Sequence, residues 1–386
     1  MPPHVSLHVA TAVALARAQS LPALVGFDGF TDAILHAVST RASMRVEDFS
    51  RIETITEFAE RVGAAAGKST NIELVRRESR FGGNGPLMAS GLAGLGARVS
   101  YVGSIGVAGE DAGGRARVDP IFAEFAKRCE RVIAIGVPGH TDAVEFADGK
   151  IMFNHTANVQ AVTWEAIVNG VGLREMREMV GSSVLLGVVN WSLLGGVPGI
   201  WRGLMRDVLV GMPTRVGGVR RRMFVDLSDP AKRTDGDIAG MLVQLREMEG
   251  VVAVTLGLNL AEAQRVAKVV GVRDDEAAEL GQRVARLASG LRDAIGIDTV
   301  VVHPREGAAA ASAGERSVWV DGPVTANPKL STGAGDHFNA GFAFAQASAM
   351  PLEQCVAVAA ATSGAYVRDA ASPTRERVAE MLRGGW

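Results

Sequence analysis

Apolar residues along the chain form two kinds of run, short ones that are apolar nearly throughout and longer ones with helical spacing. The short runs are typical of strands covered on both faces of a sheet. They predict strands at residues 23–27, 99–103, 184–189, 223–227, 251–256 and 299–303. The longer runs predict helices at residues 88–95, 121–128, 200–210, 238–248, 261–270, 277–294, 337–346 and 352–367. This alternation predicts an α/β fold, with a mostly parallel sheet between two layers of helices.

One stretch departs from the alternation. The runs at residues 143–147 and 150–154 are strand-like and are separated by Asp148 and Gly149. This dipeptide predicts a β-hairpin, because glycine tolerates the positive φ of a type I′ turn. An antiparallel hairpin in a parallel α/β protein is expected to be an appendage, either a lid or a decoration of the sheet edge.

Composition narrows the class of protein. The chain has 386 residues, of which 47% are hydrophobic and 21% charged, as in globular proteins with a sizeable core. A net charge of -2 gives no electrostatic reason to expect nucleic acid or a membrane surface as partner. No apolar run approaches the ~20 residues of a membrane span. The isolated cysteines Cys129 and Cys355 suggest a reducing, cytoplasmic setting.

Residues 62–69 nearly spell the phosphate loop of P-loop nucleotide hydrolases, with Lys68 in the place of the motif's lysine. Val62 stands where the motif needs its first glycine. A phosphate loop also follows a strand, whereas Thr54 and Glu57 form a capping-box pattern that predicts a helix here. A helix that stops near Gly67 is therefore favoured over a phosphate loop.

The most informative segment is Ser331–Phe342, which lies just before an apolar helix. Its small residues at 333–335 let the backbone approach a ligand, and free N–H groups at a helix start form an anion site. Asp336, in the first turn, could accept a proton from an attacking hydroxyl beside that site. The alternative is an ordinary glycine-rich turn with an aspartate cap.

This segment closely resembles the C-terminal signature of the ribokinase-like (PfkB) carbohydrate kinases, Asp-Thr-x-Gly-Ala-Gly-Asp-x-Phe. The matching residues are Gly333, Ala334, Gly335, Asp336 and Phe338, with Thr332 in the variable slot. The resemblance covers residues 20–370 and implies a single kinase domain over residues 1–386, of the three-layer α/β/α ribokinase-like fold. It implies a small β lid that includes residues 141–156. A helical insertion is expected around residues 40–80.

The resemblance also implies roles for particular residues. Asp336 would be the catalytic base, and Gly333, Ala334 and Gly335 would form the anion hole. The Gly-Gly turn at Gly82, Gly83 and Asn84 would contact substrate hydroxyls. An aspartate after the first strand would also bind the substrate, and either Asp28 or Asp32 could fill this role; each could equally be a plain turn residue.

The nucleotide side is expected to involve Asn259, Glu262, Thr332 and Gly307. Asn259 and Glu262 match the family's Asn-x-x-Glu element, which would organise phosphate and Mg²⁺, with Glu262 acting through water. The alternative for this pair is a helix cap. Asp226–Pro230 lies at a strand end that would shape the same side.

Two positions depart from the family pattern. Leu330 replaces the acidic residue that opens the signature, so monovalent-cation activation is not expected from this position. Leu87 replaces an asparagine of the N-terminal signature, although Asn84 lies nearby. Both departures bear on the substrate more than on the reaction.

The resemblance therefore implies transfer of the γ-phosphoryl group of ATP, with Mg²⁺, to a hydroxyl of a sugar or sugar-like molecule, with a primary hydroxyl favoured. A homodimer is also expected, because relatives are often dimers. The alternative is a sugar- or nucleotide-binding regulator that keeps the fold and has weak catalysis. A P-loop enzyme that uses Lys68 is the rival from another class.

Overall fold

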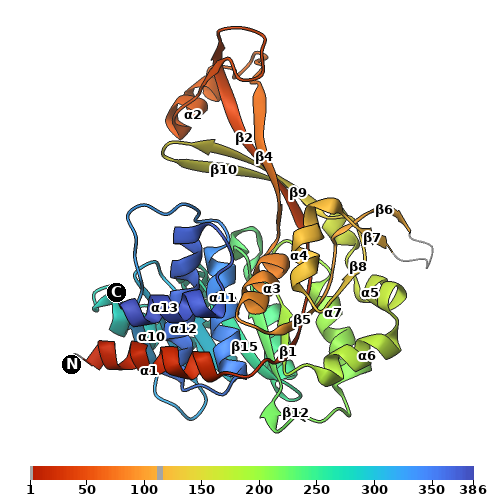
Figure 1. The fold of residues 1–386 in the computed structure, drawn as a ribbon, viewed down its shortest axis with the longest axis vertical. Helices are drawn as coiled ribbons and strands as arrows, with labels where there is room; N and C mark the ends of the chain where they lie inside the picture. Colours follow the sequence, from red (N-terminus) through yellow and green to blue (C-terminus); the bar gives the residue numbers. More distant parts are fainter. Residues whose placement is uncertain (1–2, 111–115) are drawn as a thin grey trace.

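The computed structural model describes residues 3–110 and 116–386, and its centre is an eleven-stranded sheet (Figure 1). The sheet order is β18-β17-β16-β15-β14-β11-β1-β5-β8-β7-β6. The parallel strands are β16 (Thr299–Val302), β15 (Ala253–Leu258), β14 (Arg222–Asp226), β11 (Leu185–Val188), β1 (Pro22–Phe27), β5 (Arg98–Gly103) and β8 (Arg131–Ala134). The antiparallel edge strands are β17 (Gly307–Ser312), β18 (Val318–Asp321), β7 (Ala116–Val118) and β6 (Gly106–Glu110).

Helices cover both faces of this sheet, as the alternating apolar runs predicted. One face packs against α5 (Trp164–Val171), α6 (Leu173–Ser182), α7 (Val197–Gly203), α8 (Asp235–Glu249), α9 (Leu260–Val270) and α10 (Leu280–Ile295). The other packs against α1 (Pro3–Arg17), α3 (Asn84–Gly94), α4 (Ala123–Arg128), α11 (Ala334–Ala347), α12 (Leu352–Asp369) and α13 (Arg375–Gly384). The predicted three-layer α/β/α fold is confirmed. No helix in the described ranges is long and apolar enough to cross a membrane.

All six predicted strands are central strands of the sheet, but the boundary of one was wrong. β15 begins at Ala253 rather than at residue 251. The amides of Val251 and Val252 both donate to the carbonyl of Met248, so these two residues complete the end of α8. Apolar periodicity did not separate α5 and α6 from their surroundings, and α13 was also missed.

A second, smaller sheet projects from the main body (Figure 1). We call it the lid. Its strands are β2 (Phe30–Arg41), β3 (Phe49–Arg51), β4 (Leu74–Gly82), β9 (Gly139–Phe146) and β10 (Gly149–His155). The helix α2 (Ile55–Gly63) packs Phe58 against Phe146 on one face of this sheet. The lid is therefore built from two separate segments of the chain.

The predicted hairpin is β9–β10, but its turn lies one residue earlier than expected. Phe146 pairs with Gly149, so Ala147 and Asp148 form the turn and Gly149 opens β10. Asp148 accepts a hydrogen bond from the amide of Ile55 at 2.9 Å. This contact uses the aspartate to fasten the turn to α2.

The expected helical insertion at residues 40–80 needs correction. Its described helix is α2, and much of the remainder forms β3 and β4, because β4 pairs along most of β2. Lys68 follows a helix and precedes a strand, the reverse of the order that a phosphate loop requires. The P-loop alternative is therefore wrong.

The order of strands places a topological switch point between β1 and β11. From β1 the chain builds outward through β5 and β8, and from β11 it builds in the opposite direction through β14, β15 and β16. Loops that leave the carboxyl ends of β1 and β11 therefore diverge. In open α/β sheets this divergence creates the crevice where ligands bind.

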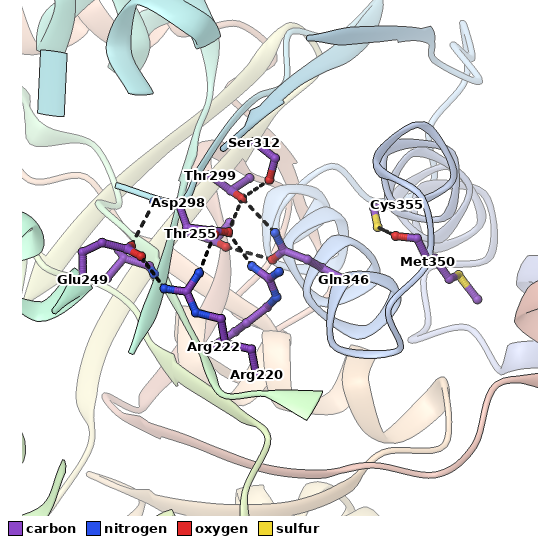
Figure 2. Close-up of polar contacts among 11 residues, drawn as sticks. Arg220, Arg222, Glu249, Thr255, Asp298, Thr299, Ser312, Gln346, Met350 and Cys355 are labelled. Carbon is purple, nitrogen blue, oxygen red and sulfur yellow. Dashed lines mark hydrogen bonds and ion pairs between the residues drawn. The ribbon is translucent and has the colours of Figure 1, made fainter. Parts of the chain in front are cut away.

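At the opposite, amino-terminal ends of the parallel strands, a mostly buried polar network joins β14, β15, β16 and β17 to α11 (Figure 2). Asp298 accepts hydrogen bonds from Arg220 at 2.9 Å and Arg222 at 2.6 Å. The side chain of Gln346, near the end of α11, bridges Thr255 at 2.8 Å and Thr299 at 3.0 Å. The far end of α11 is therefore held by specific hydrogen bonds as well as by apolar packing.

Candidate active site

Two cavities meet at the amino end of α11. The lid cavity, about 540 Å³, lies between the lid and the switch point. It is lined by Phe30, Asp32, Gly83, Asn84, Leu87, Thr141, Met152, Asn154, Asn190, Leu193, Ser228, Asp229, Lys232, Thr332, Gly333 and Asp336. The loop cavity, about 520 Å³, lies between the loop at 322–331 and the helices α11 and α12. Its lining includes His303, Gly307, Ala334 and Gly335.

The first turn of α11 separates the two cavities. Gly333, the residue before the helix, has φ 89°, a conformation that glycine adopts without strain. Gly333 and Asp336 line the lid cavity, whereas Ala334 and Gly335 line the loop cavity. A group that passes from one cavity to the other must therefore pass this turn, whose N–H groups and dipole favour an anion.

Asp336 is held beside the Gly-Gly turn rather than standing alone. Its Oδ1 accepts a hydrogen bond from Asn84 Nδ2 at 2.9 Å, and Asn84 Oδ1 accepts one from Ser228 at 3.2 Å. Burial, then the charges of Asp226 and Asp28, raises the pKa of Asp336 well above its usual value. A buried carboxylate with a raised pKa is a stronger proton acceptor when ionised, as a general base requires.

This raised pKa predicts a pH dependence of turnover. Because Asp336 must be ionised to accept a proton, kcat/KM is expected to fall as the pH falls through its pKa in the free protein. The acid limb should therefore lie above the usual aspartate value of 3.8. The check is a pH profile of phosphoryl transfer with a stability control at each pH. Full activity down to pH 4 would contradict this role.

Asp28 and Asp32, which the sequence left as alternatives, occupy different environments. Asp28 is fully buried, and its carboxylate accepts hydrogen bonds from the amides of Asn84 at 2.9 Å and Gly85 at 2.8 Å and from Asn190 at 2.7 Å. It therefore caps α3 and joins α3 to the end of β11. Burial raises its pKa to about 6. Asp32 lines the lid cavity and is the better candidate for contact with a substrate.

Substitution of each aspartate by alanine should separate the two roles. Asp32→Ala is expected to raise the KM for the acceptor about tenfold or more while the melting temperature stays near that of the wild type. Asp28→Ala leaves two buried amides and Asn190 without their acceptor, so it is expected to destabilise the fold by about 2 kcal/mol or more. Calorimetric unfolding and acceptor titrations would check both. The reverse pattern would assign substrate contact to Asp28.

The Gly-Gly turn approaches both aspartates closely. A Cβ atom on Gly82 would lie 2.4 Å from Asp32 Oδ2, and one on Gly83 would lie 3.1 Å from Asp28 Oδ2. Gly83 has φ 101° and lines the lid cavity. Gly82 does not line this cavity. Of the predicted substrate contacts, the structure thus brings Asp32, Gly83 and Asn84 together and places Gly82 behind them.

Asn259 and Glu262 form a capping box at the start of α9, and neither lines the lid cavity or the loop cavity. Glu262 Oε2 accepts from the amide of Asn259 and Oε1 from that of Asp229, both at 2.8 Å. The capping alternative is therefore present in the structure, and the expected role in binding Mg²⁺ stays a prediction. Glu262 also acts on the site through Asp229, whose loop it fixes.

Asp226, a buried carboxylate at the end of β14, is the best candidate for a cation ligand. It accepts from Asn339, one turn beyond Asp336, at 2.8 Å, but its Oδ1 has no hydrogen-bond partner. Burial, then the charge of Glu262, raises the pKa of Asp226. A divalent cation would satisfy the free oxygen and offset this repulsion, so the residues fit Mg²⁺. The described residues contain no group of three His, Cys, Asp or Glu side chains arranged as a metal site.

The remaining predicted residues fall on both sides of α11. Thr332 lines the lid cavity and its hydroxyl is buried without a partner, whereas Gly307 lines the loop cavity. His303 also lines the loop cavity, with its ring 4.5 Å from that of Phe338. His337 instead stacks on Tyr366, outside both cavities.

Sequence reasoning missed several lining residues, namely Thr141, Asn154, Asn190, Leu193 and Lys232. Asn190 follows directly on β11, and a polar residue at the end of an apolar strand was the available signal. Thr141 and Asn154 were included only as part of the predicted lid at residues 141–156. Nothing in the local pattern marked Lys232, which ends the short 3-10 helix Pro230–Lys232 after β14.

The fold and the two-cavity site define a carbohydrate kinase of the ribokinase-like (PfkB) class. An Arabidopsis thaliana ribokinase complexed with ribose and ATP is 18% identical, with a TM-score of 0.60 over 95% of this chain and 99% of that chain. A Cryptococcus neoformans ribokinase in complex with ADP is 17% identical, with a TM-score of 0.60 over 94% of this chain and 99% of that one.

Within this class, the chain belongs to the prokaryotic ketohexokinase family, whose model matches residues 10–384. A ketohexokinase of Haloferax volcanii is 30% identical over 366 residues, which is 94% of this chain and 90% of the relative. The predicted resemblance is therefore confirmed at the level of family, fold and enzyme class.

Proposed function

We propose that this protein transfers the γ-phosphoryl group of ATP to a primary hydroxyl of a ketohexose. The position of Asp336 carries the proposal, because this residue lies at the turn where two cavities meet. The lid cavity, with Asp32 and Asn84, suits a polyhydroxylated acceptor. The loop cavity suits the nucleotide. The ketose follows from the names of the family and of the Haloferax volcanii relative.

In this proposal the acceptor hydroxyl lies against Asp336. The hydrogen bond from Asn84 uses Oδ1 of the carboxylate, so Oδ2 receives the proton as the hydroxyl oxygen attacks phosphorus. The backbone amides at the start of α11 stabilise charge on the phosphoryl group as it passes from the loop cavity to the lid cavity. The bond from phosphorus to the β-γ bridging oxygen breaks, and ADP leaves.

In this proposal Mg²⁺, when bound, would neutralise charge on the phosphates of ATP, and Asp226 directly and Glu262 through water would hold it. The lid shields the acceptor from bulk water. Its strands contribute Asp32, Thr141 and Asn154 to the cavity wall. Exclusion of water directs the phosphoryl group to the sugar rather than to hydrolysis.

The test is an ADP-release assay with Mg·ATP across ketohexoses, aldohexoses, pentoses, sugar acids and nucleosides. We expect the highest kcat/KM with a ketohexose and little ATP hydrolysis without a sugar. A better aldose or nucleoside would overturn the proposed acceptor. Binding of sugar and ATP without turnover would favour the regulator alternative instead.

A further inference from the structure

Two carbonyl groups in the turn before α11 accept hydrogen bonds from side chains that line neither the lid cavity nor the loop cavity. The carbonyl of Gly333 accepts from Nδ1 of His337 at 2.7 Å, and that of Thr332 accepts from the hydroxyl of Tyr366 at 2.8 Å. The rings of His337 and Tyr366 stack, with centroids 3.7 Å apart, and both side chains are buried. The turn is therefore held from behind by two side chains that pack as one unit.

The hydrogen bonds of His337 fix which ring nitrogen carries the proton. A carbonyl oxygen can only accept, so Nδ1 carries a proton and donates it to Gly333. Burial lowers the pKa of His337 to about 4, so the ring is neutral near neutral pH. Nε2 then has no proton and accepts a hydrogen bond from the hydroxyl of Ser372 at 2.8 Å. Because both ring nitrogens have partners, the ring is held in one orientation.

These hydrogen bonds set the direction of the peptide groups in the turn. In a trans peptide group the C=O and N–H bonds point in opposite directions. The bond from Tyr366 to the carbonyl of Thr332 therefore directs the amide of Gly333 away from Tyr366. His337 fixes the next peptide group through the carbonyl of Gly333. No residue in the described ranges accepts a hydrogen bond from the amide of Gly333, so this amide is available to an anion.

We propose that His337 and Tyr366 are positioning residues for phosphoryl transfer, which hold the turn so that the amide of Gly333 meets the transferring group. An amide stabilises developing charge best when its direction is fixed before the reaction. The next amide, that of Ala334, donates to the carbonyl of Ser331 at 3.2 Å, so Gly333 supplies the amide that the turn leaves free. This inference rests on the proposed function and assigns a role to two residues outside both cavities.

Two amide side chains can each keep one of the hydrogen bonds of His337. The side-chain amide of asparagine lies as far from Cβ as Nδ1 does, so His337→Asn keeps a donor to the carbonyl of Gly333. The amide of glutamine lies as far from Cβ as Nε2 does, so His337→Gln keeps a partner for Ser372 and loses the donor to Gly333. The two variants therefore differ in which hydrogen bond they retain.

We expect His337→Gln to lower kcat about tenfold, because the lost hydrogen bond aligns a group that acts mainly in the transition state. The KM values for the ketohexose and for ATP should stay within about twofold of the wild type. His337→Asn should keep kcat within about threefold of the wild type. Steady-state kinetics per folded protein would measure these effects, with the folded fraction taken from calorimetry.

A purely structural role of His337 predicts a different pattern. Each variant loses one hydrogen bond and the ring stacked on Tyr366, so both melting temperatures should fall by similar amounts. A structural role would then lower the folded fraction alike in both variants and leave kcat per folded protein unchanged. Equal kcat in the two variants, or a rise in KM in place of the fall in kcat, would overturn the inference.

If neither variant of His337 folds, Tyr366→Phe decides. It keeps the stacked ring and loses the donor to the carbonyl of Thr332, so kcat should fall about fivefold at an unchanged KM. Wild-type kcat in Tyr366→Phe would overturn the inference. Absence of turnover with every sugar in the wild type would overturn the proposed function and this inference together. Turnover in the wild type with the same kcat in His337→Asn and His337→Gln overturns the inference alone.

Discussion

Asp336→Asn is expected to lower kcat about 10³-fold, because the amide cannot accept the proton of the attacking hydroxyl. Sugar and ATP should still bind, since the amide keeps the size of the carboxylate and can still accept from Asn84. Steady-state kinetics and calorimetric titrations would separate the two effects. Turnover near the wild-type rate would contradict the assignment of Asp336 as base.

The same substitution is expected to stabilise the folded protein. The pKa of Asp336 is raised above its unfolded value, so its contribution to stability is present at low pH and lost as the pH rises through the folded value. Above the unfolded pKa, burial of this carboxyl therefore weakens the fold, and an amide, which does not ionise, removes this cost. The melting temperature should rise while activity falls. Asp369→Asn, at an aspartate paired with Arg377 outside both cavities, is the control and should keep wild-type turnover.

Gly333→Ala is expected to lower kcat/KM about a hundredfold, through displacement of the amides that follow it. A Cβ atom at this position would lie 2.8 Å from the hydroxyl of Tyr366 and 3.1 Å from Leu87 Cδ1, and φ is 89°. The start of α11 must therefore shift. Kinetics with both substrates would measure the effect.

Two further variants make this prediction specific. Gly199→Ala, in α7, adds a methyl group where nothing lies within 4 Å and should leave activity unchanged. Tyr366→Phe combined with Gly333→Ala removes the closest contact and should recover part of the loss. Wild-type activity in Gly333→Ala alone would show that the geometry of this turn does not limit catalysis.

The layered fold could be predicted from the sequence because the central strands are buried on both faces, so their apolar runs are unbroken. The lid could be predicted only in part. The strand β4 is exposed and polar at Arg76, Arg77 and Glu78, so neither alternation nor an apolar run marked it. The strand β2 is mostly buried, but polar residues such as Asp32 and His36 interrupt its apolar residues. The segment at 40–80 was consequently assigned as helical.

The site divides in the same way. The Gly333–Asp336 turn is contiguous in sequence, so a local pattern was enough to predict a base beside an anion site. The choice between Asp28 and Asp32 depends on which carboxylate accepts hydrogen bonds from the backbone amides of α3. This contact joins segments that are distant in sequence, so no local pattern could predict it. Asn190 was missed for the same reason, because its hydrogen bond to Asp28 exists only once β11 lies beside β1.

The hydrogen bonds of Gln346 to Thr255 and Thr299 hold the far end of α11, and they extend the region where mutations can influence catalysis. The helix Ala334–Ala347 is 14 residues long, about 20 Å, with the catalytic aspartate in its first turn and the clamped amide in its last. A small rotation permitted at the clamped end would change the direction in which Asp336 points. Selection for altered turnover should therefore recover changes at Thr255, Thr299 and Gln346, which lie at the other end of α11 from the proposed catalytic aspartate.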